Sequence, residues 1–150
     1  MAKYKDPQLD DVISWHYREL DKMDTSTVEF SQAQSLINYI WGNEGLEYPP
    51  RIVPIANNTI NAVAHANRFT IAIRENIKTI DLLHELAHSM TMDFDHTVPD
   101  GGFHGRDFVG MMMKLIGTYI RIPMSKLTES ADRFGVHYNL NVKPVMLDID

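Results

Sequence analysis

The sequence contains no cysteine among its 150 residues. This absence excludes disulfide bonds, thiolate metal ligands, zinc ribbons and a cysteine nucleophile. It agrees with a reducing compartment, and we expect a cytoplasmic protein. Long apolar runs are also missing, since no segment approaches the roughly 18 consecutive apolar residues of a membrane span. The first stretch, "MAKYKDPQLDD", has no apolar core after its lysines and does not resemble a signal peptide.

Positive charge is scarce, with 14 lysines and arginines against 20 acidic residues and a net charge of -6. Non-specific nucleic-acid binding needs a basic patch, so direct binding to nucleic acid is not expected. The length suits one hydrophobic core better than two. We therefore expect a single domain over residues 1–150, with an N-terminal helical extension over 1–25 and an extended C-terminal segment over 136–150.

Apolar residues at helical spacing predict two helices in the first third of the chain. The first covers residues 6–23. The second follows directly, with Ser26 and Glu29 as a capping box at its start and Gly42 or Gly45 at its end.

Strand signals follow these helices. Residues 51–55 predict a short strand, which Pro54 restricts to a sheet edge or a bulge. A hairpin is then expected, with strands near Ile60–His65 and Arg68–Ile73. Apolar residues at every second position from Phe69 to Ile73 predict that the second strand is half-buried.

The second half of the chain returns to helical patterns. We expect a helix over Ile80–Met92, a loop over 93–105, a helix over 106–120 and a short helix over 124–135. The predicted fold class is therefore α+β, with a small antiparallel or mixed sheet that includes the hairpin and packs on the helices.

The segment "TIDLLHELAHSMT" is mostly apolar but contains His84, Glu85 and His88. On a helix, His84 and His88 project from one face a turn apart, so their imidazoles can bind one metal ion. Glu85 is rotated by about 100° from His84, where its carboxylate can take a proton from water held by the ion. This is the H-E-x-x-H arrangement of zinc peptidases.

Chance is a poor explanation for this motif. The chain has seven histidines and seven glutamates, so the pattern should arise at random about 0.015 times. Buried polar groups also need partners, and a cation would supply one for both rings in an otherwise apolar helix. The pattern therefore predicts a metal site.

A hydrolytic zinc site has three protein ligands and one open position. His104, which lies 16 residues after His88 in the glycine-rich stretch "GGFHGRDF", is the favoured third ligand because it begins the next helix. His96 is the main alternative. Weaker alternatives are the acidic residues Asp93, Asp95, Asp100 and Asp107. Asp107 has two further interpretations: it orients a ligand imidazole, or it is an acid favoured by the helix dipole.

These motifs resemble the zincin metallopeptidases, nearest to the SprT-like group that includes Spartan and related phage and bacterial proteins. The resemblance covers roughly Arg51 to Tyr119 and is carried by "RFTIAI", "IDLLHELAH" and "HGRDF", the last of the H-G-x-x-F type. It implies a zincin-like fold in which the hairpin sheet packs on the H-E-x-x-H helix and flanking helices. It also implies one zinc ion per chain, on His84, His88 and His104, with Glu85 as the general base.

The activity implied by the resemblance is hydrolysis of peptide bonds in a protein or peptide, most simply as a metalloendopeptidase. The strand Arg68–Ile73 would run along the cleft and pair with an extended substrate. For a phage-encoded protein the compartment would be the host cytoplasm. Members of the group often carry a zinc ribbon or a DNA-binding tail, and neither the cysteines nor the basic residues for these are present.

A group that stabilises the oxyanion is also expected. The candidates are Tyr119, His137, Tyr138, His96 and Arg106. Among them we favour Tyr138 or His137, because a C-terminal segment often folds back over such a site. His16 and His65 have no partner motif and are expected to be structural.

Two other classes of protein compete with the peptidase. One is a non-catalytic zinc-stabilised binding or structural protein with a zincin-like fold, in which a fourth protein ligand such as His96 blocks water activation. The presence of Glu85 argues against it, since a structural site does not need that carboxylate. The other is a nucleic-acid-associated protease, which the acidic balance disfavours. Nothing in the sequence specifies an oligomeric state.

Overall fold

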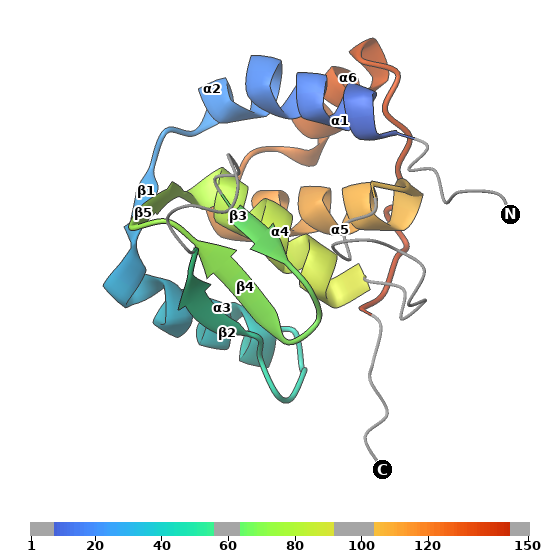
Figure 1. Ribbon diagram of the computed structural model, residues 1–150. Coiled ribbons are helices and arrows are strands. Elements are labelled where there is room, and N and C mark those ends of the chain that lie inside the picture. The colour runs from blue at the N-terminus through green and yellow to red at the C-terminus, as the bar shows by residue number, and fades with distance from the viewer. Residues whose placement is uncertain (1–7, 56–63, 92–103, 145–150) are drawn as a thin grey trace, which may run out of the picture.

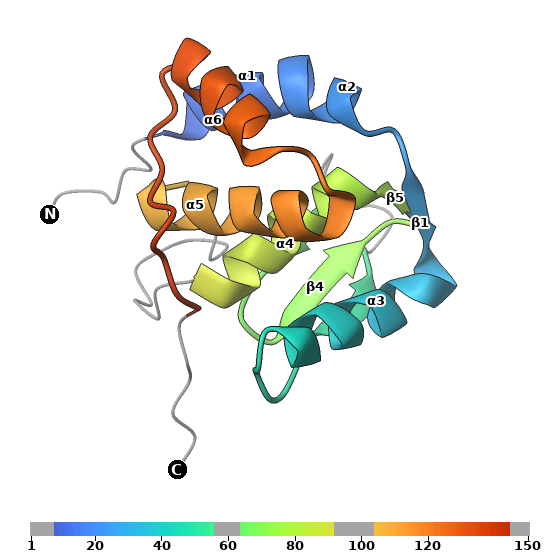
Figure 2. The same cartoon turned by 180° about the vertical axis from the view of Figure 1, so that it is seen from behind.

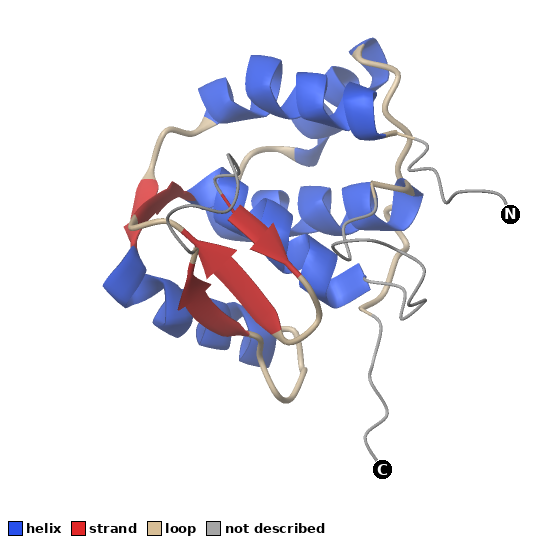
Figure 3. Ribbon diagram, viewed as in Figure 1, coloured by secondary structure: helices blue, strands red, loops and turns tan. Residues whose placement is uncertain are grey.

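The computed structural model describes residues 8–55, 64–91 and 104–144. These residues form a mixed α+β structure with two small sheets, and helices lie on one face of the larger sheet (Figures 1 and 3). The α+β class is therefore confirmed. Most of the expected loop over 93–105, and the first residues of the expected hairpin, lie outside the described residues.

The first predicted helix consists of three consecutive segments: α1 (Leu9–Trp15), the π-helical turn η1 (His16–Leu20) and α2 (Asp21–Met23). Its apolar side is fully buried at Val12, Trp15 and Leu20. The indole nitrogen of Trp15 donates a 2.9 Å hydrogen bond to the hydroxyl of Ser130. The N-terminal helical region is therefore part of the core.

The predicted capping box at Ser26 and Glu29 is wrong. This stretch forms the strand β1 (Thr27–Glu29), which pairs antiparallel with β5 (Asn76–Lys78), and α3 (Phe30–Asn43) begins only afterwards. The backbone of Glu29 is extended, and no side chain caps the helix. Pairing with a strand about 50 residues away in the sequence overrides a local capping signal, because each ladder pair satisfies backbone groups of both strands.

The end of α3 depends on Gly45 rather than on Gly42. Gly45 has a φ of +77°, a left-handed conformation that glycine adopts without strain. Its N–H donates to the carbonyl of Gly42, and the N–H of Leu46 donates to that of Trp41. These two bonds satisfy carbonyls that the last helical turn leaves free.

The larger sheet contains β2 (Arg51–Pro54), β3 (Ala64–Ala66) and β4 (Thr70–Ile73), in the order β2-β4-β3. The β3–β4 pair is antiparallel, which confirms the hairpin, and β2 is the edge strand that Pro54 indicated. The half-buried alternation is wrong, because Phe69 is 58% exposed whereas all residues from Ile71 to Ile73 are buried.

The position of β4 corrects a second expectation. It is hydrogen-bonded to β2 on one side and to β3 on the other, so its backbone has no edge for a substrate. β3 is the other edge strand of the described sheet, opposite β2, and it packs against the helix that carries the H-E-x-x-H motif (Figure 1).

The remaining predicted helices are present: α4 (Thr79–Thr91), α5 (Arg106–Leu115) with the π-helical turn η3 (Ile116–Ile120), and α6 (Met124–Arg133). α4 crosses α5 in the middle of the molecule, as both views show (Figures 1 and 2). Pro123 precedes α6, and Gly135, with a φ of +68°, follows it.

A continuous cluster of buried apolar side chains extends from Val12 to Val142. α4 contributes nine buried residues to the interior, including both histidines of its motif. Within the described residues, no helix is both long enough and apolar enough to cross a membrane.

Candidate metal centre

The H-E-x-x-H motif lies in the middle of α4. His84 and His88 are one helical turn apart on the same face, and their ring centroids are 5.0 Å apart. Only 9% of His84 and 4% of His88 is exposed. The helix therefore holds both imidazoles in the interior, as their spacing predicted.

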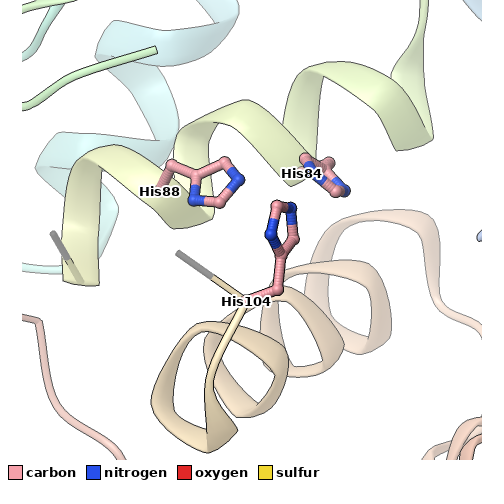
Figure 4. Close-up of side chains that lie close together, drawn as sticks. All are labelled: His84, His88 and His104. Atoms are coloured by element: carbon pink, nitrogen blue, oxygen red, sulfur yellow. The ribbon is translucent and has the colours of Figure 1, made fainter. Parts of the chain in front are cut away.

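His104 reaches the same place from the segment that begins α5. The packing of α5 on α4 brings its ring to 5.4 Å from His84 and 4.7 Å from His88, measured between centroids. Each of the three residues offers a ring nitrogen, and these nitrogens all lie within 4.8 Å of one another. Figure 4 shows the three side chains converging from the two helices. The structure thus brings together the three residues predicted to be ligands.

Phe108 lies one turn beyond His104 and lines the cluster. Its ring stacks on His88 at 4.0 Å with an interplanar angle of 14°, and it meets His84 edge-on at 4.9 Å. This aromatic surface fixes the orientation of the rings and keeps their surroundings apolar.

Burial lowers the pKa of both His84 and His88 well below the ordinary value, and the neighbouring histidines lower it further because two imidazolium charges would repel each other. Both rings are therefore neutral at neutral pH. A neutral imidazole keeps the nitrogen lone pair with which histidine binds metals.

Glu85 follows His84 on α4 and is partly exposed. Burial raises the pKa of its carboxyl to about 8; the charge of His16 opposes this shift and that of Asp81 adds to it. A cation within about 4–6 Å would favour the carboxylate form again. The charge state of this carboxyl would therefore respond to a cation at that distance.

The three histidines fit a zinc ion by donor type and number. Nitrogen ligands at about 2.0–2.1 Å in a tetrahedral site lie about 3.4 Å from each other, so the nitrogens need only a modest contraction to share one ion. In the part of the chain that the structure describes, this group has three members and no carboxylate. Three protein ligands leave the fourth position open, as in hydrolytic zinc sites.

The alternatives for the third ligand are only partly covered by the structure. His96, Asp93, Asp95 and Asp100 lie outside the described residues. Asp107 is exposed, and its carboxylate accepts a 3.0 Å hydrogen bond from the side chain of Asn139. The dipole interpretation of Asp107 agrees with its place in the first turn of α5.

The C-terminal segment does return to the site, but through its backbone. The Gln8 amide donates to the carbonyls of both His104 and His137, each at 3.0 Å. The side chain of His137 is exposed, and the hydroxyl of Tyr138 donates to Asp132 at 3.1 Å. The described contacts do not connect either side chain to the three histidines, so their catalytic role stays a prediction.

Two other candidates for oxyanion stabilisation were Tyr119 and Arg106. The Tyr119 hydroxyl donates to Glu44 at 2.7 Å and accepts from Asn43, and burial raises its pKa to about 12. Arg106 is exposed at the start of α5.

The sequence interpretation missed His16. Its ring is 4% exposed, and its Nδ1 atom lies 3.2 Å from Nδ1 of His84. Burial alone would lower the pKa of His16, but hydrogen bonds to Asp21 and Asp81 outweigh it and raise the pKa to about 9. Asp81 lies three residues before His84 on α4, so helical spacing contained a signal for Asp81. His16 is 68 residues from His84 in the sequence, and no local pattern relates the two.

Comparison of the chain with known protein families, with curated proteins and with solved structures finds no match.

Proposed function

We propose that this protein is a zinc-dependent metallopeptidase of the zincin type, nearest to the SprT-like group, which hydrolyses peptide bonds in a protein or peptide substrate. The observation that supports this proposal best is the convergence of His84, His88 and His104 on one buried point. Glu85 stands beside them on the same helix. A structural site would need the three histidines but not the acid.

Zinc at this place would polarise a scissile carbonyl and lower the pKa of water to about 7. Glu85 accepts the proton of the attacking water and passes it to the leaving amine. Its carboxyl is suited to both steps, because its pKa is raised by burial and falls when a cation is near. Phe108 and the buried faces of the rings keep bulk solvent from the histidines.

The strand arrangement suggests how a substrate binds. β3 lies against α4 and is outermost in the described sheet, so it takes the substrate-pairing role that we expected for Arg68–Ile73. The hydroxyl of Ser89 on α4 donates to the carbonyl of Asn67 just after β3 and holds strand and helix together. Pairing of this kind binds backbone, so it selects extended chains more than particular sequences.

The competing function is a non-catalytic zinc-stabilised binding or structural protein. A fourth protein ligand would be its signature, and the described part of the cluster contains three ligands. A direct observation of the fourth position therefore separates the two functions. X-ray absorption of the zinc-loaded protein counts nitrogen and oxygen neighbours.

The activity test compares wild type with Glu85→Gln at matched zinc content, using unfolded casein and a library of unstructured peptides as substrates. Gln has nearly the shape of Glu but cannot accept the proton of water. We expect the variant to keep its zinc and its fold and to lose cleavage. Glu47→Gln changes an exposed glutamate after α3 in the same way and should cleave like wild type.

Equal cleavage by wild type and Glu85→Gln would remove Glu85 as the base. Absence of cleavage by zinc-loaded wild type, together with a fourth protein ligand, would support the binding protein instead.

A further inference from the structure

The side chains of Asp81, His16 and His84 are in contact one after another, with His16 between the other two. The Nε2 atom of His16 lies 2.5 Å from Oδ1 of Asp81, and its Nδ1 atom lies 3.2 Å from Nδ1 of His84. The two imidazole rings are 5.0 Å apart and nearly perpendicular, at 72°. Both nitrogens of a buried histidine are thus engaged, one with a carboxylate and the other with a predicted metal ligand.

The backbone explains how His16 comes to this place. It is the first residue of the π-helical turn η1, and such turns are frequent at functional sites. The preceding residue, Trp15, is buried and bonds to Ser130 of α6. Trp15 therefore contacts α6, and the next residue, His16, contacts α4.

We propose that His16, supported by Asp81, is a positioning residue that orients His84 for the metal. An ion on Nε2 of His84 excludes a proton from that atom, so the proton of the ring lies on Nδ1. That N–H then donates to Nδ1 of His16, 3.2 Å away, which requires a neutral His16 ring. Because the pKa of His16 is about 9 in the ion-free protein, ion binding must displace the second proton of this ring. The opposite nitrogen of His16 carries its own proton and donates it to the carboxylate of Asp81.

This arrangement fixes both the rotation of the His84 ring and the atom that faces the ion. Partners of this kind behind a ligand commonly change metal affinity by about 10–100-fold when they are removed. The inference concerns His84, the predicted ligand that His16 contacts.

The same residues have a second interpretation. His16, Asp21 and Asp81 offer ligand atoms within 4.8 Å of one another and would form a separate cation site. The present contacts favour hydrogen bonding, because Nε2 of His16 already bonds to Asp81. Lys78 also places its ammonium 3.6 Å from Asp21 and supplies positive charge there. A second bound ion is an outcome of the test.

The inference rests on the metal site of the proposed function but not on peptide hydrolysis, so its test measures zinc affinity. Zinc dissociation constants are determined by chelator competition for wild type, His16→Phe and His16→Gln. Phe keeps a ring of similar size without nitrogen. The amide of Gln can accept from His84 and donate to Asp81. We expect about 10–100-fold weaker binding for His16→Phe and a largely restored affinity for His16→Gln.

Asp81 provides the second arm of the experiment. Asp81→Ala should weaken zinc binding, whereas Asp81→Asn, which keeps an acceptor, should weaken it less. Asp11→Ala removes an exposed acid from α1 and should leave affinity unchanged. Melting of the ion-free variants identifies any that fail to fold.

Nitrogen-15 NMR of the zinc-loaded protein reads the proton positions directly. We expect a proton on Nδ1 of His84 and one on Nε2 of His16. Equal affinity of wild type and His16→Phe, equal losses in the Phe and Gln variants, or a doubly protonated His16 would overturn the inference. A second zinc equivalent that disappears in His16→Phe would overturn it in favour of the cation site. If zinc-loaded wild type cleaved no peptide but the variants still differed in zinc affinity as expected, only the proposed function would be contradicted.

Discussion

Gly110 of α5 and Asn139 of the C-terminal segment are in direct backbone contact. A β-carbon added at Gly110 would lie 1.8 Å from the carbonyl oxygen of Asn139, which is far inside van der Waals contact. The N–H of Asn139 in turn donates to the carbonyl of Arg106 at 3.0 Å. The C-terminal segment is therefore fastened along the helix that begins beside His104.

Gly110→Ala should destabilise the protein, because the clash involves backbone that cannot rotate away. Overpacking of this kind typically costs about 1–3 kcal/mol, and we expect the upper part of that range. Denaturation in urea measures the change. Gly42→Ala is the matched control, since nothing lies within 4 Å of its added carbon. Equal stability of the two variants would mean that the C-terminal segment does not hold this position in solution.

His104→Ala should reduce the bound zinc from about one ion per chain to a small fraction, because two imidazoles alone bind zinc weakly. Metal analysis of purified protein measures the zinc content. The control is His137→Ala, which removes an exposed histidine from the C-terminal segment. Unchanged zinc in His104→Ala would transfer the third ligand to His96 or to an acid of the loop.

Removal of zinc should lower the melting temperature. Zinc at a thousand times its Kd stabilises the native state by about 4 kcal/mol. In a domain of this size that corresponds to a shift on the order of 10 °C. The ion would bind nitrogens from both α4 and the start of α5, so its removal takes away a link between the two helices. Chelator-treated protein is melted with and without added zinc, and His104→Ala should show little response. Superimposed curves for wild type would show that α4 and α5 pack equally well without the ion.

The stability of the contact between η1 and α6 should depend on acid pH through Glu19. Hydrogen bonds from Ser130 and Arg133 lower the pKa of the Glu19 carboxyl, and slight desolvation opposes them. A lowered pKa means that this contribution is present above the ordinary value of 4.5 and is lost as the pH falls through the folded-state pKa. Urea unfolding at several pH values measures it.

Wild type should therefore lose its advantage over Glu19→Gln as the pH falls below about 4.5, the ordinary glutamate value. Glu47→Gln is the control for a general effect of removing a negative charge. A constant difference between wild type and Glu19→Gln at all pH values would contradict the role of this carboxylate.

The three clustered histidines show how far local pattern can go. His84 and His88 are separated by one helical turn, and any helix over this segment places them on one face. The helix itself was predictable, because its apolar residues recur at helical spacing and α4 is buried on nearly all sides. His104 was predictable for a similar reason, since it immediately precedes a helix with a clear apolar face.

Local pattern failed where distant partners compete with it. Ser26 and Glu29 have the spacing of a capping box, but the segment pairs with β5 and becomes a strand. The predicted hairpin was correct. The central position of β4, however, depends on β2, a strand that precedes the hairpin in the sequence and pairs with β4 in parallel. The order of strands in a sheet is a relation between separate segments, so the alternation within one strand does not encode it.

The sequence by itself determined the α+β class, the principal helices, the hairpin and the placement of His84 and His88 on one helix face, because each depends on the period of a single helix or strand. Only the tertiary structure decided that His16 of η1 meets His84 and that β3 rather than β4 is the outer strand beside α4. Those relations arise from the packing of whole elements. The burial of apolar surface selects that packing, and no single segment contains it.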